Sequence, residues 1–133
     1  MFENVFDIDP GAGEAELRAQ VESLEKLKSV AAATQARATA LWVAKRRAAE
    51  EAAGMPAARR GKGVASEVAL ARRESPTCGN RHLGFAQAVV HEMPHTLAAL
   101  ETGILSEWRA TLIVKQSACL PLEHRRALDA ELC

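Results

Sequence analysis

The sequence predicts an all-α fold, with a long N-terminal helix over about residues 14–53 packed with, or extending from, a cluster of about five shorter helices. Hydrophobic residues make up 48% of the 133 positions, but alanine dominates them, and there is no tyrosine. Small apolar side chains favour close helix packing and make poor strand cores. The absence of glycine and proline between residues 14 and 53 leaves that stretch uninterrupted. A chain of 133 residues is long enough for one domain with a hydrophobic core.

The long helix is preceded by a leader, residues 1–13, which ends in the turn signal Asp9-Pro10-Gly11. At a rise of 1.5 Å per residue, about forty helical residues would span roughly 60 Å, which exceeds the needs of a compact domain. The helix carries an apolar stripe at heptad spacing, made of Leu17, Leu24, Ala31 and Ala38 with Leu27, Thr34, Leu41 and Ala48. The helix either packs lengthwise against the rest of the chain or pairs with another chain as a coiled coil.

Breakers then divide the chain. Gly54-Met55-Pro56 ends the long helix, and residues 54–63 form a basic loop rich in glycine and proline. Residues 64–133 are the multi-helix portion of the same domain, beginning with a helix from about Val64 to Arg73. Ser75 caps the next helix and Pro76 takes its first position.

The third helix continues to His91–Met93, although Gly79 and Gly84 reduce its stability and allow close helix approach. Pro94 then starts a short helix that ends at Gly103 as its C-terminal cap. Ser106 caps a further helix to about Ser117, and the last helix covers residues 121–133. Trp42 and Trp108 are expected to anchor the core.

Charge is balanced overall but unevenly distributed. Residues 1–44 carry seven acids and four bases (−3), residues 45–82 four acids and nine bases (+5), and residues 83–133 six acids and four bases (−2). A basic middle can contact phosphates without reading sequence, or it can be an ordinary solvated surface. The candidate phosphate contacts are Lys45, Arg46, Arg47, Arg59, Arg60, Lys62, Arg72, Arg73 and Arg81.

Residues 91–95, HEMPH, fit the zinc-protease motif H-E-x-x-H. That motif requires two histidines on one face of an unbroken helix. Pro94 lies between His91 and His95, removes a helical N–H and displaces Met93 from helical geometry. We therefore expect a helix boundary and no metal site here.

A second pattern, E-V-A, S-P and H-L across residues 67–83, resembles a helix-turn-helix unit. Its internal lock is weak, because Arg72 and Glu74 replace apolar residues that usually flank the turn. Arg73 stands in place of the turn glycine, and Gly79 in place of an apolar packing residue. The pattern favours plain packing of two helices over a reader of the major groove.

Three cysteines without CxxC spacing favour free, mostly buried thiols in a reducing cytoplasm. The first ten residues are acidic and do not resemble a signal peptide. No uncharged apolar run approaches the roughly 18 residues of a membrane span. No small-molecule site, phosphate loop or catalytic set can be identified in the sequence.

The chain resembles the helical "domain of unknown function 222" of actinobacterial proteins, over most of its length and most specifically over residues 64–133. The matching features are MFENVFD at residues 1–7, Ser75-Pro76, Arg81-His82-Leu83, Met93-Pro94, residues 96–100, Gly103, residues 105–110, Leu120-Pro121 and residues 128–132. In that family the helical region usually precedes an HNH endonuclease domain, whose histidines and metal ion cut DNA.

This resemblance implies a non-catalytic N-terminal region of an HNH-endonuclease-like protein that serves association with double-stranded DNA, positioning or assembly. No HNH cluster is present in the sequence, so a divalent metal would belong to an absent domain and this chain holds no cofactor. Because the family's helical region normally runs further, the chain is expected to be an N-terminal portion, a truncated copy or a short stand-alone version. The alternative is a helical interaction module, dimeric through residues 14–53, with no DNA role.

Overall fold

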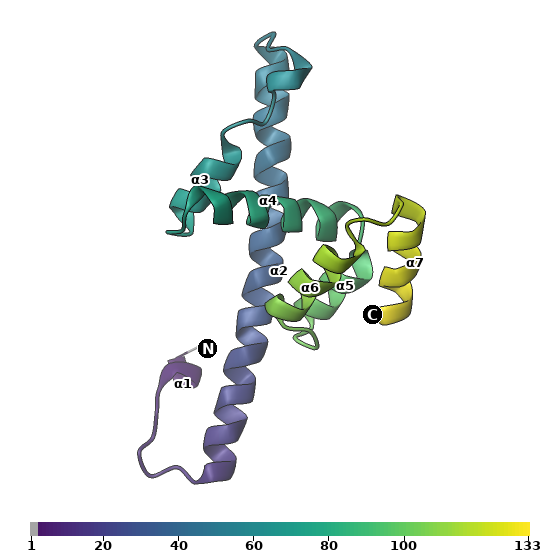
Figure 1. Ribbon diagram of the computed structural model, residues 1–133. Helices are drawn as coiled ribbons and strands as arrows, with labels where there is room; N and C mark the ends of the chain where they lie inside the picture. The colour runs from purple at the N-terminus through teal and green to yellow at the C-terminus, as the bar shows by residue number, and fades with distance from the viewer. Residues whose placement is uncertain (1–2) are drawn as a thin grey trace.

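The computed structural model describes residues 3–133, and within them the only regular elements are helices (Figure 1). The all-α prediction is therefore confirmed. Met1 and Phe2, at the start of the predicted leader, lie outside the described residues. The helices are α1 (Glu3–Phe6), α2 (Glu14–Ala52), a 3₁₀ turn (Ala57–Arg59), α3 (Val64–Ala71), α4 (Pro76–His91), α5 (Pro94–Glu101), α6 (Glu107–Ser117) and α7 (Leu122–Leu132).

The 39-residue helix α2 forms a rod that extends beyond the other helices at both ends (Figure 1). Helix α4 crosses it near the middle, with α3 on one side and α5, α6 and α7 on the other. At the N-terminal end the leader folds back along the rod. The Gln20 side-chain amide donates hydrogen bonds to the carbonyl oxygens of Val5 (3.0 Å) and Asp7 (2.7 Å).

The face that α2 buries is not the predicted stripe. Six of the eight stripe positions are exposed and only Leu24 and Leu27 are half-buried, so α2 packs against the shorter helices through a face other than the stripe. Side chains that are mostly small form the buried face because they let the crossing helices approach the α2 backbone closely. The buried residues are Ser29, Ala32, Ala33, Ala36, Thr39, Ala40 and Val43.

Three small apolar clusters form the core along α2. They are centred on Ala33 with Leu100 and Ala110, on Ala36 with Ala86 and Val89, and on Val43 with Val64 and Val68. Trp42 is half-buried against the third cluster, as a core anchor should be. Trp108 is 68% exposed, so its predicted role as a core anchor is wrong. Ala110, two residues later on α6, occupies the core in its place.

Local capping signals are confirmed. Ser75 accepts a hydrogen bond from the Cys78 N–H (3.4 Å), with Pro76 as the first residue of α4. Ser106 accepts one from the Arg109 N–H (3.2 Å) at the start of α6. Gly103 adopts φ +78° beyond the end of α5, the left-handed conformation that a C-terminal cap requires.

The HEMPH segment is a helix boundary, as predicted. Helix α4 ends at His91, Met93 leaves helical geometry (φ −131°, ψ 65°), and α5 begins at Pro94. Across the described chain, no three His, Cys, Asp or Glu side chains are grouped so that they could hold a metal ion. All three cysteines are free, and Cys119 and Cys133 are exposed, so the prediction of mostly buried thiols is wrong.

The start of α5 is capped by a residue from the far end of the chain. Met93, the N-cap residue, makes no side-chain capping hydrogen bond, and the Asp129 carboxylate on α7 takes that role. Asp129 is completely buried and accepts hydrogen bonds from the His95 N–H (2.9 Å), the Thr96 N–H (2.7 Å) and the Thr96 hydroxyl (2.6 Å). An ion pair between Arg125 and Glu92 (2.9 Å) adds a second link between α7 and the α4–α5 junction.

Helices α3 and α4 pack closely, as the interpretation of this pattern as plain helix packing predicts. Gly79 is buried, and a Cβ added there would overlap the carbonyl oxygen of Ala65 and lie 2.7 Å from the Ala69 Cβ. Backbone approach therefore replaces the interlocking apolar side chains expected at this turn. Arg73, which stands in place of a turn glycine, adopts the left-handed conformation (φ +58°) that glycine would favour.

Of the helices in residues 3–133, none combines the length and apolar character needed to cross a membrane.

Candidate nucleic-acid interface

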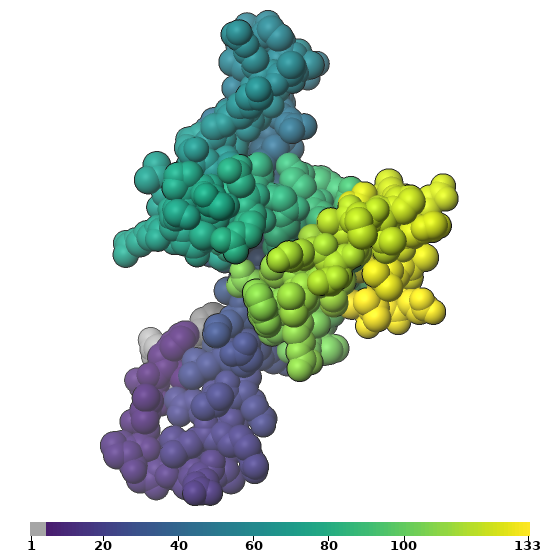
Figure 2. Space-filling model, viewed as in Figure 1, coloured from purple at the N-terminus to yellow at the C-terminus, as the bar shows by residue number. Residues whose placement is uncertain are grey.

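The fold gathers six of the nine candidate basic residues at one end of the rod. Residues 53–63 turn back on the C-terminal end of α2, so that Gly61 lies against the Arg47 side chain. Figure 2 shows this end standing clear of the helices α4 to α7. We call it the basic tip, residues 45–63. It contains Lys45, Arg46, Arg47, Arg59, Arg60 and Lys62.

Acidic residues hold the basic tip in shape. The Glu50 carboxylate accepts a hydrogen bond from the Gly61 N–H (2.7 Å), which fixes the returning loop. Arg60 donates to the Met55 carbonyl oxygen (2.9 Å) and lies 3.8 Å from Glu51. These contacts, together with positive φ angles at Gly54, Gly61 and Gly63, define a compact turn.

The basic tip keeps a net positive charge after its acidic residues are counted. Its six bases and two acids give a net charge of +4. Arg46 forms an ion pair with Glu67 on α3 (2.6 Å), so it also ties the tip to the body. Within the described part of the chain, Lys45, Arg47, Arg59 and Lys62 have no ion-pair partner, and all four are exposed.

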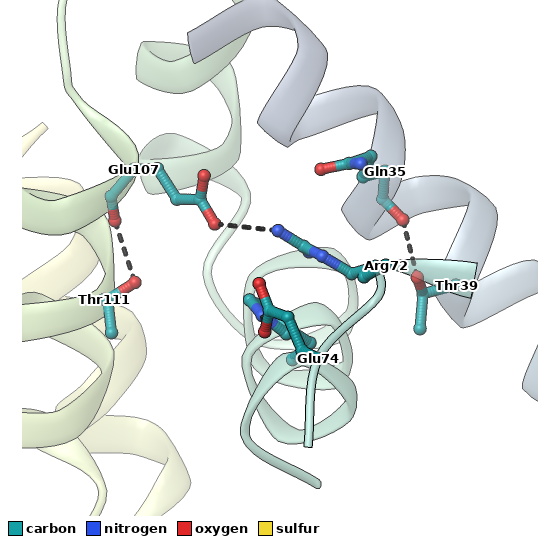
Figure 3. Close-up of polar contacts among 7 residues, drawn as sticks. Gln35, Thr39, Arg72, Glu74, Glu107 and Thr111 are labelled. Carbon is teal, nitrogen blue, oxygen red and sulfur yellow. Dashed lines mark hydrogen bonds and ion pairs between the residues drawn. The ribbon is translucent and has the colours of Figure 1, made fainter. Parts of the chain in front are cut away.

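The other three candidates lie elsewhere. Arg72 turns inward from the end of α3 and meets Glu107 at the start of α6, at 3.5 Å (Figure 3). Arg73 is exposed at the α3–α4 turn, and Arg81 is exposed on α4 with its guanidinium 3.6 Å from the Cys78 sulfur. Arg72 is thus committed to an internal contact and is a poor phosphate ligand.

The polar contact of Arg72 joins the α3–α4 turn to α6. Glu107 faces Arg72 through its carboxylate, and its backbone carbonyl accepts a hydrogen bond from the Thr111 hydroxyl (2.8 Å). On the other side of Arg72, the Thr39 hydroxyl bonds to the Gln35 carbonyl oxygen within α2 (2.7 Å; Figure 3). This arrangement connects the α3–α4 turn to α6 and is structural in character.

Glu74 and His82 form a second polar pair beside it, with 2.7 Å between Glu74 Oε2 and His82 Nε2. The hydrogen bond from His82 lowers the pKa of Glu74 below its ordinary value of 4.5, and the charges of His82 and Arg72 act in the same direction. The pair closes the α3–α4 turn, since Glu74 precedes α4 and His82 lies within it.

Two adjoining hollows lie along α4 and α6, of about 570 and 590 Å³, and they share Phe85 and Trp108 in their linings. Their walls combine bases such as Arg81 and Lys115 with acids such as Glu107. Such mixed charge does not favour a polyanion, so the basic tip remains the candidate contact surface.

No family model, no curated protein and no solved structure matches this chain.

The clustering of Arg59, Arg60 and Lys62 with the end of α2 follows from the glycines at 54, 61 and 63, which mark a loop that reverses direction. Sequence reasoning missed the part of Asp129, although Pro94 at the start of α5 with Met93 before it leaves two helix N–H groups without a local acceptor.

Proposed function

We propose that the chain is a non-catalytic helical module that associates with double-stranded DNA through the basic tip. The observation that carries the proposal is that six basic residues, from two segments of the chain, lie at one projecting end of α2. The resemblance to the helical region of HNH-endonuclease-like proteins supports the same nucleic-acid context and a place in the cytoplasm, where the free thiols would stay reduced.

The basic tip suits phosphate contact for electrostatic reasons. Lysine and arginine side chains that neutralise phosphates release condensed counterions, which gives an affinity that falls with salt and depends little on sequence. The Arg47 side chain lies against Gly61, Lys62 follows Gly61 in the chain, and Arg59 is exposed two residues before Gly61. The module would therefore position a protein on DNA without selecting a site.

The test is a fluorescence-anisotropy titration of a random-sequence duplex at a series of salt concentrations. The variant Arg47→Ala/Arg59→Ala/Lys62→Ala removes three exposed charges from the tip. Each lost phosphate contact should reduce the slope of log affinity against log salt by about 0.9. We expect affinity at low salt to fall by at least roughly tenfold.

A matched control variant removes the same number of positive charges from surfaces outside the basic tip. The variant Arg18→Ala/Lys115→Ala/Arg126→Ala removes three exposed bases from α2, α6 and α7. It should keep most of the affinity and the salt slope. Equal loss in both variants, or no salt-sensitive binding by the unaltered protein, would contradict the proposal.

Catalysis is tested separately. We expect duplex DNA to remain intact after incubation with the protein and Mg²⁺, Mn²⁺ or Zn²⁺. Specific cleavage that persists through purification would overturn the non-catalytic assignment.

The competing role is a helical interaction module with no DNA function. The exposed stripe of α2 favours it, because leucines at heptad spacing remain accessible to a partner. Loss of DNA binding with retained self-association would support this role alone.

A further inference from the structure

The exposed stripe of α2 is apolar on the side of the helix that the core does not use. Leu17 is 40% exposed and Leu41 is 58% exposed, while Ala31, Thr34 and Ala38 between them are also exposed. The core-facing residues follow a different set of positions, such as Ala33, Ala36 and Ala40. The core and the stripe therefore lie on different faces of α2, and covering the stripe requires no change in the packing of the core.

We propose that a second copy of this chain covers the stripe, with the two α2 helices antiparallel and in one defined register. In this register the residue numbers of facing positions add up to 65. Leu24 then faces Leu41 of the second copy, Leu27 faces Ala38, and Ala31 faces Thr34. The symmetry axis passes between residues 32 and 33, and six central layers form.

The size of the facing side chains favours this arrangement. Four of the six layers contain a leucine, and Leu27 faces a small residue, Ala38, in two of them. A parallel pair would instead stack Ala31, Thr34 and Ala38 on themselves and leave three successive layers without a large side chain. Apolar burial is the main driving force of helix pairing, so the antiparallel register buries leucine surface more evenly.

Charge favours the same orientation. Residues 14–25 of α2 contain four acids and one base, a net −3, and residues 40–51 contain three bases and two acids, a net +1. The antiparallel register places these two segments against each other. A parallel pair would place each segment against its own copy and would bring Lys45 onto Lys45, where like charges repel.

Pairing of two copies through α2 does not depend on DNA binding. It does affect how DNA would be held, because the register places the two basic tips at opposite ends of the pair. The two Arg47 residues would be 29 positions apart along the paired helices, roughly 43 Å at 1.5 Å per residue.

Cysteine cross-linking tests the orientation. In a background with Cys78→Ser, Cys119→Ser and Cys133→Ser, two variants are made, Leu24→Cys and Leu41→Cys. Under mild oxidation, a disulfide-linked dimer should form when the two variants are mixed and not when either is oxidised alone. Cross-linking of each variant with itself would show a parallel pair and overturn the proposal.

Sedimentation equilibrium tests the face. The unaltered protein should approach about twice its mass of 14.3 kDa as its concentration rises. Ala31→Glu/Ala38→Glu places charges in the stripe at exposed helix positions, where the monomer fold is not disturbed, and the dimer should be lost. The control Ala127→Glu/Ala130→Glu changes two exposed alanines on α7 and should remain dimeric. A monomer at all concentrations, or equal loss in the control, would exclude this interface.

Discussion

Replacement of Gly79 by alanine is the most direct test of how α3 and α4 are held together. The added Cβ would overlap the backbone carbonyl oxygen of Ala65 and approach the Ala69 Cβ to 2.7 Å. A backbone oxygen cannot rotate away, so α4 must shift from α3 along most of their shared surface. Overpacking of this kind typically costs about 1–3 kcal/mol.

A gain in helix propensity partly offsets that cost. Alanine stabilises the interior of a helix by about 1 kcal/mol relative to glycine. Because the contact at Ala65 is with backbone, we place the cost at the upper end of the range, and the net loss at about 2 kcal/mol. Gly84 is the control, since it lies on the same helix and has nothing within 4 Å of an added Cβ. Gly84→Ala should therefore stabilise the protein by about 0.5–1 kcal/mol.

The assay is chemical denaturation followed by far-UV circular dichroism, with free energies of unfolding compared at constant slope. The two variants should move the denaturation midpoint in opposite directions. Ala69→Gly added to Gly79→Ala should restore little, because it leaves the overlap with the Ala65 carbonyl in place. If Gly79→Ala unfolds at the same denaturant concentration as the unaltered protein or higher, close backbone contact is not what joins α3 to α4.

Three further changes have clear expected signs. Asp129→Ala should lower the free energy of unfolding by about 3 kcal/mol, because buried donors at the start of α5 lose their acceptor; amide exchange of His95 and Thr96 should quicken. Arg73→Gly should raise the midpoint of thermal unfolding and stabilise by about 0.5–1 kcal/mol, since it relieves a left-handed residue at some cost in chain entropy. Glu74 has a lowered pKa, so its contribution is present above pH 4.5 and is lost as the pH falls through its folded value. The stability gap between the protein and Glu74→Gln should therefore narrow in acid, and a gap that is constant down to pH 3 would refute the linkage.

Local signals predicted the boundaries of this fold well. Ser75, Pro76, Pro94 and Ser106 act through contacts within three residues of themselves, and each lies where its chemistry requires. The capping of α5 by Asp129 is a contact across more than thirty residues, and no local pattern could assign it. Sequence likewise located the basic segments, while the fold decided which of them meet at the basic tip.

The face of α2 that is buried could not be predicted, for a different reason. A helix rich in alanine is weakly apolar on every side, so heptad spacing of leucines alone cannot say which face meets the rest of the chain. Here α4 and α5 cross closely and select alanines, because small side chains permit a short distance between helix axes.

The leucines of the α2 stripe that lie outside the core indicate a second contact surface. Burying a leucine side chain contributes about 1.5–3 kcal/mol, and the fold leaves that contribution unused at Leu41. The core packs on one face of α2 and the stripe lies on another. A second copy can therefore cover the stripe while the core contacts stay in place. A rod with one face for the core, one for a second copy and a charged end clear of both can assemble and bind a polyanion at the same time. Disruption of the stripe by Ala31→Glu/Ala38→Glu should therefore weaken binding to long duplexes, where two tips engage, and leave binding to short duplexes nearly unchanged.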